Sequence, residues 1–348
     1  MNALQLSARH FKLHFKSPFG IAHGTRNFTD TIYVKASFMD IEGYGEAALP
    51  PYLNYDAETL VKDYHSYFPS QMDGSEAIRI ALLKLNQSDV NLPKPLRTAT
   101  DIALHDLFGK LTGRTVRGIF GIGEPSQVQC SYTLGISSVE VMKEKLSEAG
   151  DFRLFKLKLG DQHDKARIEA FLSVSDAAFC VDANQAWETT TESIEWINWL
   201  KDRGCLFVEQ PMPVSKAGEF EHLFRASSLP VILDESLQGL NELEELKGVC
   251  HGINVKLVKC GGIEPAVNLV RQANKLGLKV LVGCMSESSC GAMAAAQLSA
   301  WADWVDLDGP MLIGNDPFSG ANYRDGSLVL SQQAGTGAVL KDKDLFSN

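Results

Sequence analysis

The sequence predicts a parallel (β/α)8 barrel, the TIM-barrel fold, preceded by a smaller α+β domain. From about residue 128 onward, eight short apolar runs rich in β-forming residues recur, with one helix-sized segment between neighbours. Before that point, strand-like segments are followed by helical ones, which is typical of an α+β domain. The length of 348 residues suits a barrel of about 200 to 250 residues with a second, smaller domain.

The first domain is expected to cover residues 1–120 and to begin with antiparallel strands. Alternating patterns indicate these strands, and Gly43-Tyr44-Gly45 is expected to close the second one. Helical periodicity follows, and the strongest helix is expected to end at Gly113. The expected strands cover residues 4–15 and 31–38, and the expected helices cover residues 56–67, 75–85 and about 96–111.

The eight apolar runs are expected to form the barrel, which we assign to residues 121–314. Eight βα units imply a closed parallel sheet with right-handed crossovers. An open doubly wound sheet is the structural alternative, but it usually has about five or six units and a glycine-rich phosphate loop. No G-x-G-x-x-G follows any run. The strands are expected at Cys130–Leu134, Phe155–Leu159, Phe179–Val181, Leu206–Val208, Val231–Leu233, Gly252–Leu257, Lys279–Val282 and Trp304–Leu307.

The C-terminal tail, from about 315 to 348, is polar and rich in turn-forming residues. It contains one strand-like segment, residues 327–330. We expect the tail to leave the barrel and to return to the first domain.

Charge and composition limit the classes of function. The net charge of −10 disfavours nucleic acid or an anionic membrane as a partner, although a bound metal would still allow a small anionic substrate. No apolar run approaches the ~18 residues that cross a membrane, and the first residues lack a signal-peptide core, so we expect a cytoplasmic protein. The seven cysteines show no C-x-x-C spacing and are expected to be buried reduced thiols. Without an H-E-x-x-H pair, a zinc hydrolase is disfavoured.

Polar residues stand where the expected barrel strands end, and they recur at the length of one βα unit. Successive separations of 24, 27, 25, 22, 27 and 23 residues join Lys158, Asp182, Glu209, Asp234, Lys256, Gly283 and Asp306. These residues should therefore lie side by side on the C-terminal rim, where barrel enzymes place their active sites.

Three of these residues, Asp182, Glu209 and Asp234, each follow an almost wholly apolar strand. Three negative charges that converge in a partly buried mouth repel strongly, and a divalent cation removes that repulsion. Oxygen ligands suit Mg²⁺ or Mn²⁺ better than Zn²⁺, and a six-coordinate Mg²⁺ would keep about three positions for water and substrate. The alternative is that each acid is an ordinary helix N-cap, but three acids at barrel spacing favour metal ligands.

Three lysines stand beside these acids. Lys156 and Lys158 are two residues apart, so they share the inward face of their strand while their apolar neighbours face the outer helices. Lys256 comes four strands later, across the barrel mouth. Burial and nearby cations can lower a lysine pKa from ~10.4 toward neutrality, which would make Lys158 and Lys256 usable as bases. The alternative is that the lysines only form salt bridges with the acids.

Two bases on opposite faces of one carbon predict a 1,1-proton transfer. One of Lys158 and Lys256 would remove an α-proton, and the other would return a proton to the opposite face. The difficult step is to form a carbanion beside a carboxylate. Mg²⁺ can bind that carboxylate and stabilise the enediolate that forms, and Lys156 is a substrate-binding candidate that could donate to the same charge.

Five motifs surround these residues: LKLG from Leu157, VDANQAW from Val181, VEQPMP from Val208, LDES from Leu233 and NVKLVKCGGI from Asn254. Together they resemble the enolase superfamily, in its muconate-lactonizing-enzyme subgroup, over nearly the whole chain. The resemblance implies a modified TIM barrel with an N-terminal α+β capping domain. It also implies one Mg²⁺ per subunit, with Mn²⁺ as a substitute, and is compatible with a homo-oligomer. Sites of this superfamily use a lysine or histidine base beside Mg²⁺.

Within this subgroup the chain is most similar to the dipeptide epimerases, through GCMSESS from Gly283 and DLDGP from Asp306. The resemblance implies that Asp306 and Asp308 hold the ammonium group of a dipeptide whose C-terminal residue is inverted at its α-carbon. Two carboxylates at i and i+2 share one face, which suits an ammonium ion, whereas a plain turn at this point is the alternative. Thr133 and Met285 are further candidate substrate-binding residues.

The capping domain is expected to set side-chain specificity through two loops, residues 17–28 and 49–55. The resemblance implies an arginine in the first loop for relatives that act on Ala-Glu. Here Gly24 stands near that position, and Arg26 lies two residues later. Arg26 is the candidate substitute, and specificity for Ala-Glu is left open.

Two other classes of function compete with a dipeptide epimerase. A cycloisomerase or an o-succinylbenzoate synthase of the same subgroup is the main alternative, but its substrates carry no ammonium group for Asp306 and Asp308. A barrel that only binds a ligand, or that has a structural role, is disfavoured because the two lysines and three acids are all present.

Overall fold

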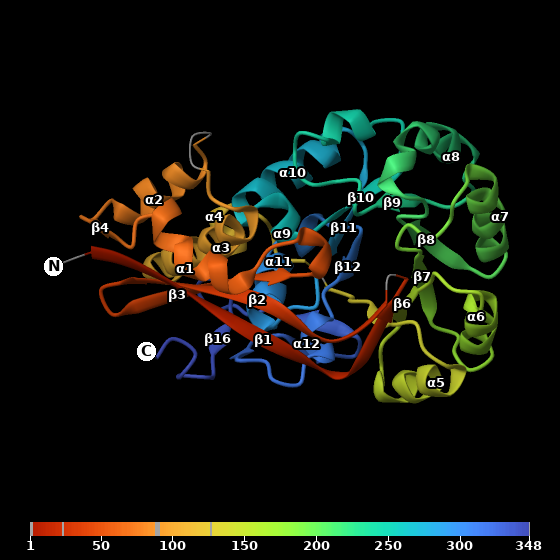
Figure 1. Ribbon diagram of the computed structural model, residues 1–348, viewed down its shortest axis with the longest axis horizontal. Coiled ribbons are helices and arrows are strands. Elements are labelled where there is room, and N and C mark those ends of the chain that lie inside the picture. The colour runs from red at the N-terminus through yellow and green to blue at the C-terminus, as the bar shows by residue number, and fades with distance from the viewer. Residues whose placement is uncertain (1–2, 23, 88–90, 126, 348) are drawn as a thin grey trace.

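The computed structural model describes residues 3–22, 24–87, 91–125 and 127–347, and it consists of two parts (Figure 1). A four-stranded antiparallel sheet of order β3-β2-β1-β4 packs with helices at one end, and an eight-stranded parallel sheet forms the other. The predicted fold class, a TIM barrel with an N-terminal α+β part, is confirmed. The N-terminal strands are β1 (Ala3–Ile21), β2 (Gly24–Phe38), β3 (Ile41–Leu49) and β4 (Gln71–Asp73).

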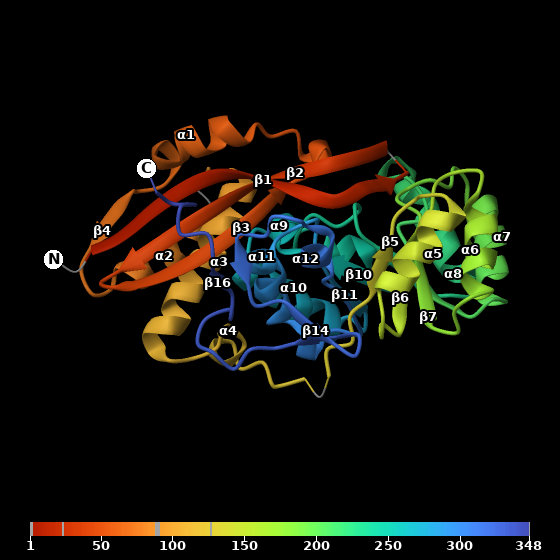
Figure 2. The ribbon, with the colours of Figure 1, turned by 90° about the horizontal axis from the view of Figure 1, so that it is seen from below.

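The first two strands form a hairpin that is longer than expected. β1 pairs with β2 up to Ile21 and Gly24, with a register shift between His14 and Phe19. Residues 17–28, which we expected as a loop, therefore lie largely in this hairpin, whose tip reaches across the barrel (Figure 2). The register shift interrupts the alternation of side chains, which is why the pattern did not predict the extension.

Gly43-Tyr44-Gly45 does not close a strand, and the prediction was wrong here, because the three residues lie inside β3. A Cβ atom on Gly43 would lie 2.3 Å from the carbonyl oxygen of Ala103, and one on Gly45 would lie 2.0 Å from that of Ala99. Both carbonyls belong to the helix α3 (Lys94–Thr112). The glycines are therefore required by the close approach of this helix and not by a turn.

Helices cover the N-terminal sheet as the periodicity predicts. Asp56 caps the first helix, since its Oδ1 accepts a hydrogen bond from Thr59 N at 2.8 Å. Gly113 ends the third helix with a φ of 66°. Apolar faces of sheet and helices form one buried cluster. The elements are η1 (Pro51–Leu53), a 3₁₀ helix, and the α-helices α1 (Ala57–Tyr67), α2 (Ala77–Leu85), α3 (Lys94–Thr112) and α4 (Val116–Ile119).

Eight parallel strands, in sequential order, form the barrel close to the predicted ranges. The barrel is nearly closed, since Ser131 N, just before the first strand, donates a hydrogen bond to Val305 O of the last strand at 2.9 Å. The strands are β5 (Tyr132–Leu134), β6 (Leu154–Lys158), β7 (Ala178–Asp182), β8 (Cys205–Glu209), β9 (Val231–Leu233), β10 (Gly252–Val255), β11 (Lys279–Gly283) and β12 (Trp304–Asp306).

The segments between these strands contain helices, with one exception. Between β9 and β10 the expected helix is replaced by a short 3₁₀ turn, η3 (Leu243–Leu246). Gly248 follows it with a φ of 76°, which ends any helical path. The other elements are α5 (Val139–Glu148), α6 (Asp164–Leu172), α7 (Thr190–Lys201), η2 (Val214–Glu219), α8 (Phe220–Ala226), α9 (Leu257–Cys260), α10 (Ile263–Lys275), α11 (Ser289–Ala296), η4 (Ser299–Trp301) and α12 (Gly309–Leu312).

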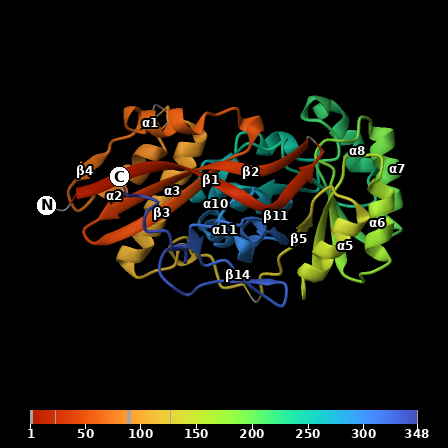
Figure 3. The same cartoon turned by 60° about the horizontal axis from the view of Figure 1, so that its bottom comes forward.

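The C-terminal tail runs back to the N-terminal part, and Figure 3 shows the C-terminus beside the N-terminal sheet. Thr336 N donates a hydrogen bond to Asp106 Oδ1 at 2.8 Å, and Val116 N donates to Gly335 O at 2.9 Å. The tail also contains a short strand close to the expected segment 327–330. Its strands are β13 (Phe318–Ser319), β14 (Asn322–Arg324), β15 (Ser327–Val329) and β16 (Val339–Leu340).

The seven cysteines form no disulfide bond. Five of them are buried, and Cys260 and Cys284 are half-buried. In the described part of the chain, no helix is long and apolar enough to cross a membrane.

Candidate active site

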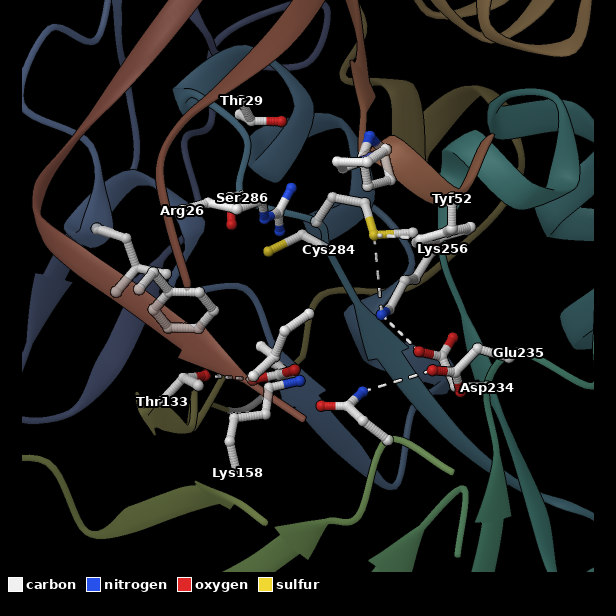
Figure 4. A pocket seen from close by; sticks show the side chains of 18 of the residues that line it. Arg26, Thr29, Tyr52, Thr133, Lys158, Asp234, Glu235, Lys256, Cys284 and Ser286 are labelled. Atoms are coloured by element: carbon white, nitrogen blue, oxygen red, sulfur yellow. Dashed lines mark hydrogen bonds and ion pairs between the residues drawn. The ribbon is translucent and has the colours of Figure 1, made fainter. Parts of the chain in front are cut away.

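A cavity of about 490 Å³ lies between the tip of the β1–β2 hairpin, the turn that contains Tyr52 and the C-terminal rim of the barrel. Figure 4 shows side chains from both parts of the molecule around this cavity. Two predicted site residues, Asp182 and Glu209, are fully buried and are not among those that line it. The predicted site residues that line it are Arg26, Thr133, Lys156, Lys158, Asp234, Lys256, Met285, Asp306 and Asp308.

Lys156 lies at the centre of a buried charge network. Its Nζ is 2.8 Å from Glu209 Oε2, 2.8 Å from Asp306 Oδ2 and 3.2 Å from Asp182 Oδ2. Burial opposes a charged lysine, but these carboxylates, Asp306 most strongly, raise the pKa of Lys156 well above its ordinary value. In this network Lys156 is therefore held as a positive charge and a hydrogen-bond donor.

Lys158 and Lys256 enter the cavity from strands on opposite sides of the barrel (Figure 4). Lys158 Nζ lies 2.6 Å from Asp182 Oδ2, and Lys256 Nζ lies 2.7 Å from Asp234 Oδ2. Burial would lower the pKa of Lys256, but the Asp234 carboxylate outweighs burial and the pKa is raised. The expected shift toward neutrality does not hold for Lys256 here, because its nearest charge is a carboxylate.

The three predicted metal-ligating acids share one arrangement of their two oxygens. A fixed donor holds one oxygen of each: Asn184 N is 2.9 Å from Asp182 Oδ1, Asn254 Nδ2 is 2.8 Å from Glu209 Oε1, and Lys259 Nζ is 2.5 Å from Asp234 Oδ1. The second oxygen of each acid lies beside a lysine of the mouth. In each acid, therefore, one carboxylate oxygen accepts a hydrogen bond from a fixed donor, and the other oxygen lies beside a lysine that lines the cavity.

The acids differ in their electrostatic surroundings. Burial would raise the pKa of Asp182, but Lys158 and Lys156 lower it to about 2. Lys256 and Lys259 likewise outweigh burial and hold the pKa of Asp234 well below its usual range. Burial and the neighbouring Asp182 raise the pKa of Glu209 to about 7. The charge of Glu209 is thus the least compensated of the three.

These acids suit a hard divalent cation. Their donor set consists of carboxylate oxygens only, which favours Mg²⁺ or Mn²⁺. Glu209 Oε2 is buried and accepts no hydrogen bond from any residue that the structure describes, although Lys156 lies close by. Lys156 Nζ, at 2.8 Å, pairs with this buried oxygen without forming a hydrogen bond, and a cation would satisfy the oxygen more fully.

A second cluster with metal-like spacing lies elsewhere, between α3 and α10. Ligand atoms of Asp101, His105 and Glu264 come within 4.8 Å of one another, and the three predicted acids do not meet this spacing in the described structure. Asp101 Oδ1 accepts a hydrogen bond from Ile263 N at 2.5 Å, so it caps the first turn of α10. Asp101 therefore has a structural role in this cluster.

Sequence reasoning missed three polar residues beside the acids. Asn254 donates a hydrogen bond to Glu209, and Lys259 donates one to the carboxylate of Asp234. Lys259 also donates to the backbone oxygen of Asp234 at 2.6 Å. Glu235 lines the cavity, where burial and Asp234 raise its pKa to about 7. All three stand inside the motifs NVKLVKCGGI and LDES. No spacing rule singles them out, because only the folded geometry shows which polar atoms meet.

Asp306 and Asp308 lie on one face, as their spacing predicts, but their surroundings differ. Asp306 accepts hydrogen bonds from Lys156 and from Ser131 Oγ at 2.5 Å. Asp308 is held by Thr133, through the backbone N at 2.5 Å and Oγ1 at 3.2 Å. Burial and Asp306 raise the pKa of Asp308 to about 7. Asp308 is a buried carboxyl group that forms no ion pair with any described residue.

Arg26 reaches the cavity from β2, and Met285 reaches it from the segment after β11. The Nε atom of Arg26 is buried and has no hydrogen-bond partner among the described residues. Met285 Sδ accepts a weak hydrogen bond from Tyr52 OH at 3.6 Å and lies 4.0 Å from Lys256 Nζ. The structure therefore brings an incompletely satisfied guanidinium group and an adaptable thioether to the same cavity.

A family model described as enolase C-terminal domain-like matches residues 138–344, and the chain belongs to the enolase superfamily. The sequence is 38% identical to the L-Ala-D/L-Glu epimerase of Bacteroides thetaiotaomicron over 94% of this chain and 86% of that protein. It is 34% identical to the L-Ala-D/L-amino acid epimerase of a Maribacter species over 97% of this chain and 99% of that protein.

A solved structure agrees with these relatives. The dipeptide epimerase of Enterococcus faecalis, complexed with Mg and the dipeptide L-Leu-L-Tyr, matches with a TM-score of 0.87 and 28% identity. The match covers 97% of this chain and 99% of that one. The resemblance to the dipeptide epimerases of this superfamily is therefore confirmed.

Proposed function

We propose that this enzyme is a dipeptide epimerase, an isomerase that inverts the α-carbon of the C-terminal residue of a dipeptide. The observation that carries the proposal is the pair of lysines, Lys158 and Lys256, which enter one cavity from opposite sides of the barrel. A base on each face of a carbon allows a proton to leave from one side and another to be delivered on the opposite side. The named epimerases among the relatives support this reaction.

Asp182, Glu209 and Asp234 would hold one Mg²⁺, for which Mn²⁺ is the expected substitute. When bound, this ion supplies positive charge that stabilises the negative charge developed on a substrate carboxylate. As ligands, Asp182 and Asp234 would share their charge with the ion and would act less strongly on Lys158 and Lys256. Each lysine would then lose part of the carboxylate field that now favours its protonated form, and could serve as a base.

Lys156 would donate hydrogen bonds to the substrate carboxylate, since it remains charged in the buried network. Its ion pairs with Glu209 and Asp306, at 2.8 Å each, hold the ammonium group in place beside the cavity that Lys156 lines. A fixed donor at this point needs no reorganisation when charge develops on the substrate.

Asp306 and Asp308 would bind the substrate ammonium group, with Thr133 holding Asp308 in place. A buried carboxyl group without a counter-ion suits a cationic ligand, because the ligand then supplies the missing charge. This feature disfavours a cycloisomerase or an o-succinylbenzoate synthase, whose substrates lack an ammonium group.

Arg26 would bind the side chain of the second residue when that side chain is acidic, and Met285 would contact the substrate beside Lys256. A guanidinium group forms its strongest hydrogen bonds with carboxylates. Peptides of the Ala-Glu type are therefore among the substrates that this cavity would accept.

A dipeptide library in D₂O tests the proposed function. With Mg²⁺ present, deuterium should appear at the α-carbon of the C-terminal residue of at least one dipeptide, together with its epimer, and chelation by EDTA should abolish both. Exchange with no dipeptide, but turnover of a succinylbenzoate precursor, would reject the proposal in favour of the alternative.

A further inference from the structure

We propose that Asn254 is a positioning residue of the metal site, which holds Oε1 of Glu209 so that this acid offers one oxygen, Oε2, to the cation. This inference rests on the proposed function, because it presumes that Glu209 is a metal ligand. Beyond that function, Asn254 would limit the way in which Glu209 binds the cation.

The anchoring bond is the only polar contact of the Asn254 side chain in the described structure. Asn254 Nδ2 donates to Glu209 Oε1 at 2.8 Å, and Asn254 Oδ1 is buried with no hydrogen-bond partner. Asn254 is 0% exposed, as is Glu209. A buried amide that satisfies only one of its polar atoms costs stability, so its direction toward Glu209 calls for a reason beyond folding.

The neighbouring strand makes room for this amide. A Cβ atom on Gly283, in β11, would lie 2.5 Å from Asn254 Oδ1 and 3.0 Å from Nδ2. Asn254 therefore occupies the space that any other residue at Gly283 would fill. The two strands together fix the amide plane, and through it one oxygen of Glu209.

These hydrogen bonds affect how many carboxylate oxygens each acid can offer to a cation. Mg²⁺ requires near-octahedral geometry with short bonds, whereas the larger Ca²⁺ takes six to eight oxygens and accepts bidentate carboxylates. With Oε1 tied to Asn254, Glu209 is disposed to bind a cation through Oε2 rather than through both oxygens. Asn184 N and Lys259 restrict Asp182 and Asp234 in the same way. Of these donors, only Asn254 is an uncharged side chain, so replacing it changes geometry without changing charge.

Isothermal titration of the substrate-free protein with MgCl₂ and with CaCl₂ tests this role. Asn254→Leu and the smaller Asn254→Ala should each weaken Mg²⁺ binding by about tenfold or more, which is usual when a partner of a metal ligand is lost. Ca²⁺ binding should weaken less or improve, so that the preference for Mg²⁺ over Ca²⁺ falls. The apparent KM for Mg²⁺ should rise, while kcat at saturating Mg²⁺ should change far less.

A buried amide elsewhere provides the matched control. Gln297 is 1% exposed and accepts a hydrogen bond from Arg117 N at 3.1 Å. Gln297→Met should lower the melting temperature and leave the Mg²⁺/Ca²⁺ preference unchanged.

Three outcomes would overturn the inference. If both Asn254 variants bind Mg²⁺ and Ca²⁺ as the native protein does, Asn254 does not position Glu209, and the proposed function stands. If both ions lose affinity equally, Asn254 has only a structural role. If the native protein binds no Mg²⁺, the proposed metal site itself fails.

Discussion

Asp308 carries the most specific information about the substrate at the scale of single residues. It is 3% exposed and held by Thr133, and its raised pKa of about 7 follows from burial and from the neighbouring Asp306. Lys156 is engaged with Asp306, so it does not neutralise Asp308 directly. A substrate ammonium group would supply the missing positive charge.

Asp308→Asn should therefore weaken the use of dipeptides, because the amide keeps the shape of the side chain but removes its charge. Charged hydrogen bonds contribute about 1.5–3 kcal/mol, so kcat/KM should fall roughly 10- to 100-fold. Steady-state kinetics on a dipeptide and on the corresponding N-acylated amino acid, which has no ammonium group, would measure the loss. It should be confined to the dipeptide.

The control for this prediction is Asp303→Asn. Asp303 pairs with Lys279 at 2.6 Å at the opposite end of the barrel strands, so this substitution should leave kcat/KM unchanged. Equal losses for both substrates in Asp308→Asn would show that this residue does not bind the ammonium group.

The sequence could predict those residues whose position follows from spacing alone. Lys158, Asp182 and Glu209 end their strands, and Asp234 and Lys256 directly follow theirs. The barrel period places strand ends on one rim. Spacing alone could not predict the roles of Asn254 and Lys259, because these roles depend on the carboxylate oxygens of Glu209 and Asp234 that they contact. The raised pKa of Lys256 also escaped it, because the sequence does not reveal that Asp234 is its nearest charge.

At the scale of elements, the contact between β3 and α3 organises the N-terminal part. Gly43 and Gly45 allow the strand to approach the helix backbone closely. The same pattern of glycines would be equally compatible with a turn, which is why local sequence reasoning ended the strand there. The long β1–β2 hairpin was underestimated because the register shift between His14 and Phe19 interrupts the alternation of side chains.

Gly45→Ala should lower the free energy of unfolding by about 1–3 kcal/mol, which is usual for inserting a methyl group into a filled space. A Cβ atom there would lie 2.0 Å from Ala99 O and 2.6 Å from Ala103 N. Urea denaturation measures the change. Gly123→Ala is the control, because nothing lies within 4 Å of its Cβ position. A Gly45 variant as stable as this control would contradict the close approach of strand and helix.

At the scale of the whole molecule, the cavity needs both parts of the chain. We propose that residues 1–120, with the tail from about 315 to 348, form one unit over the barrel of residues 121–314. Glu46 of β3 joins the two, since it accepts hydrogen bonds from Ser288 N at 3.0 Å and Gly291 N at 2.8 Å. These donors stand at the start of α11, directly after the segment that carries Met285.

A second acid, Glu287, lies beside Glu46 in this interface. A Cβ atom on Gly291 would meet Glu287 Oε2 at 2.0 Å and Glu46 Oε2 at 3.2 Å, so both carboxyl groups approach the same point. Burial raises the pKa of Glu46 to about 7, and burial together with Glu46 raises the pKa of Glu287 to about 8. Both values exceed the 4.5 of a free glutamate.

Stability should therefore fall as pH rises. Between about pH 4.5 and pH 8 the folded state binds more protons than the unfolded state, and the stability gained from this binding is lost as pH passes the raised pKa values. Melting temperatures between pH 5 and pH 9 should decline, and Glu287→Gln should decline less because its amide does not titrate. The exposed control Glu221→Gln should match the native protein, and an unchanged slope in Glu287→Gln would refute the assignment.

The central claim is that Lys158 and Lys256 act on opposite faces of one substrate carbon. Its most direct test is solvent exchange in D₂O with each epimer of an accepted dipeptide supplied separately. Lys158→Ala and Lys256→Ala should each lose epimerisation by about 10²- to 10⁴-fold. Each variant should still exchange the α-proton of one epimer, and the two variants should retain opposite epimers. Exchange of both epimers by either variant at native rates would contradict the two-base account.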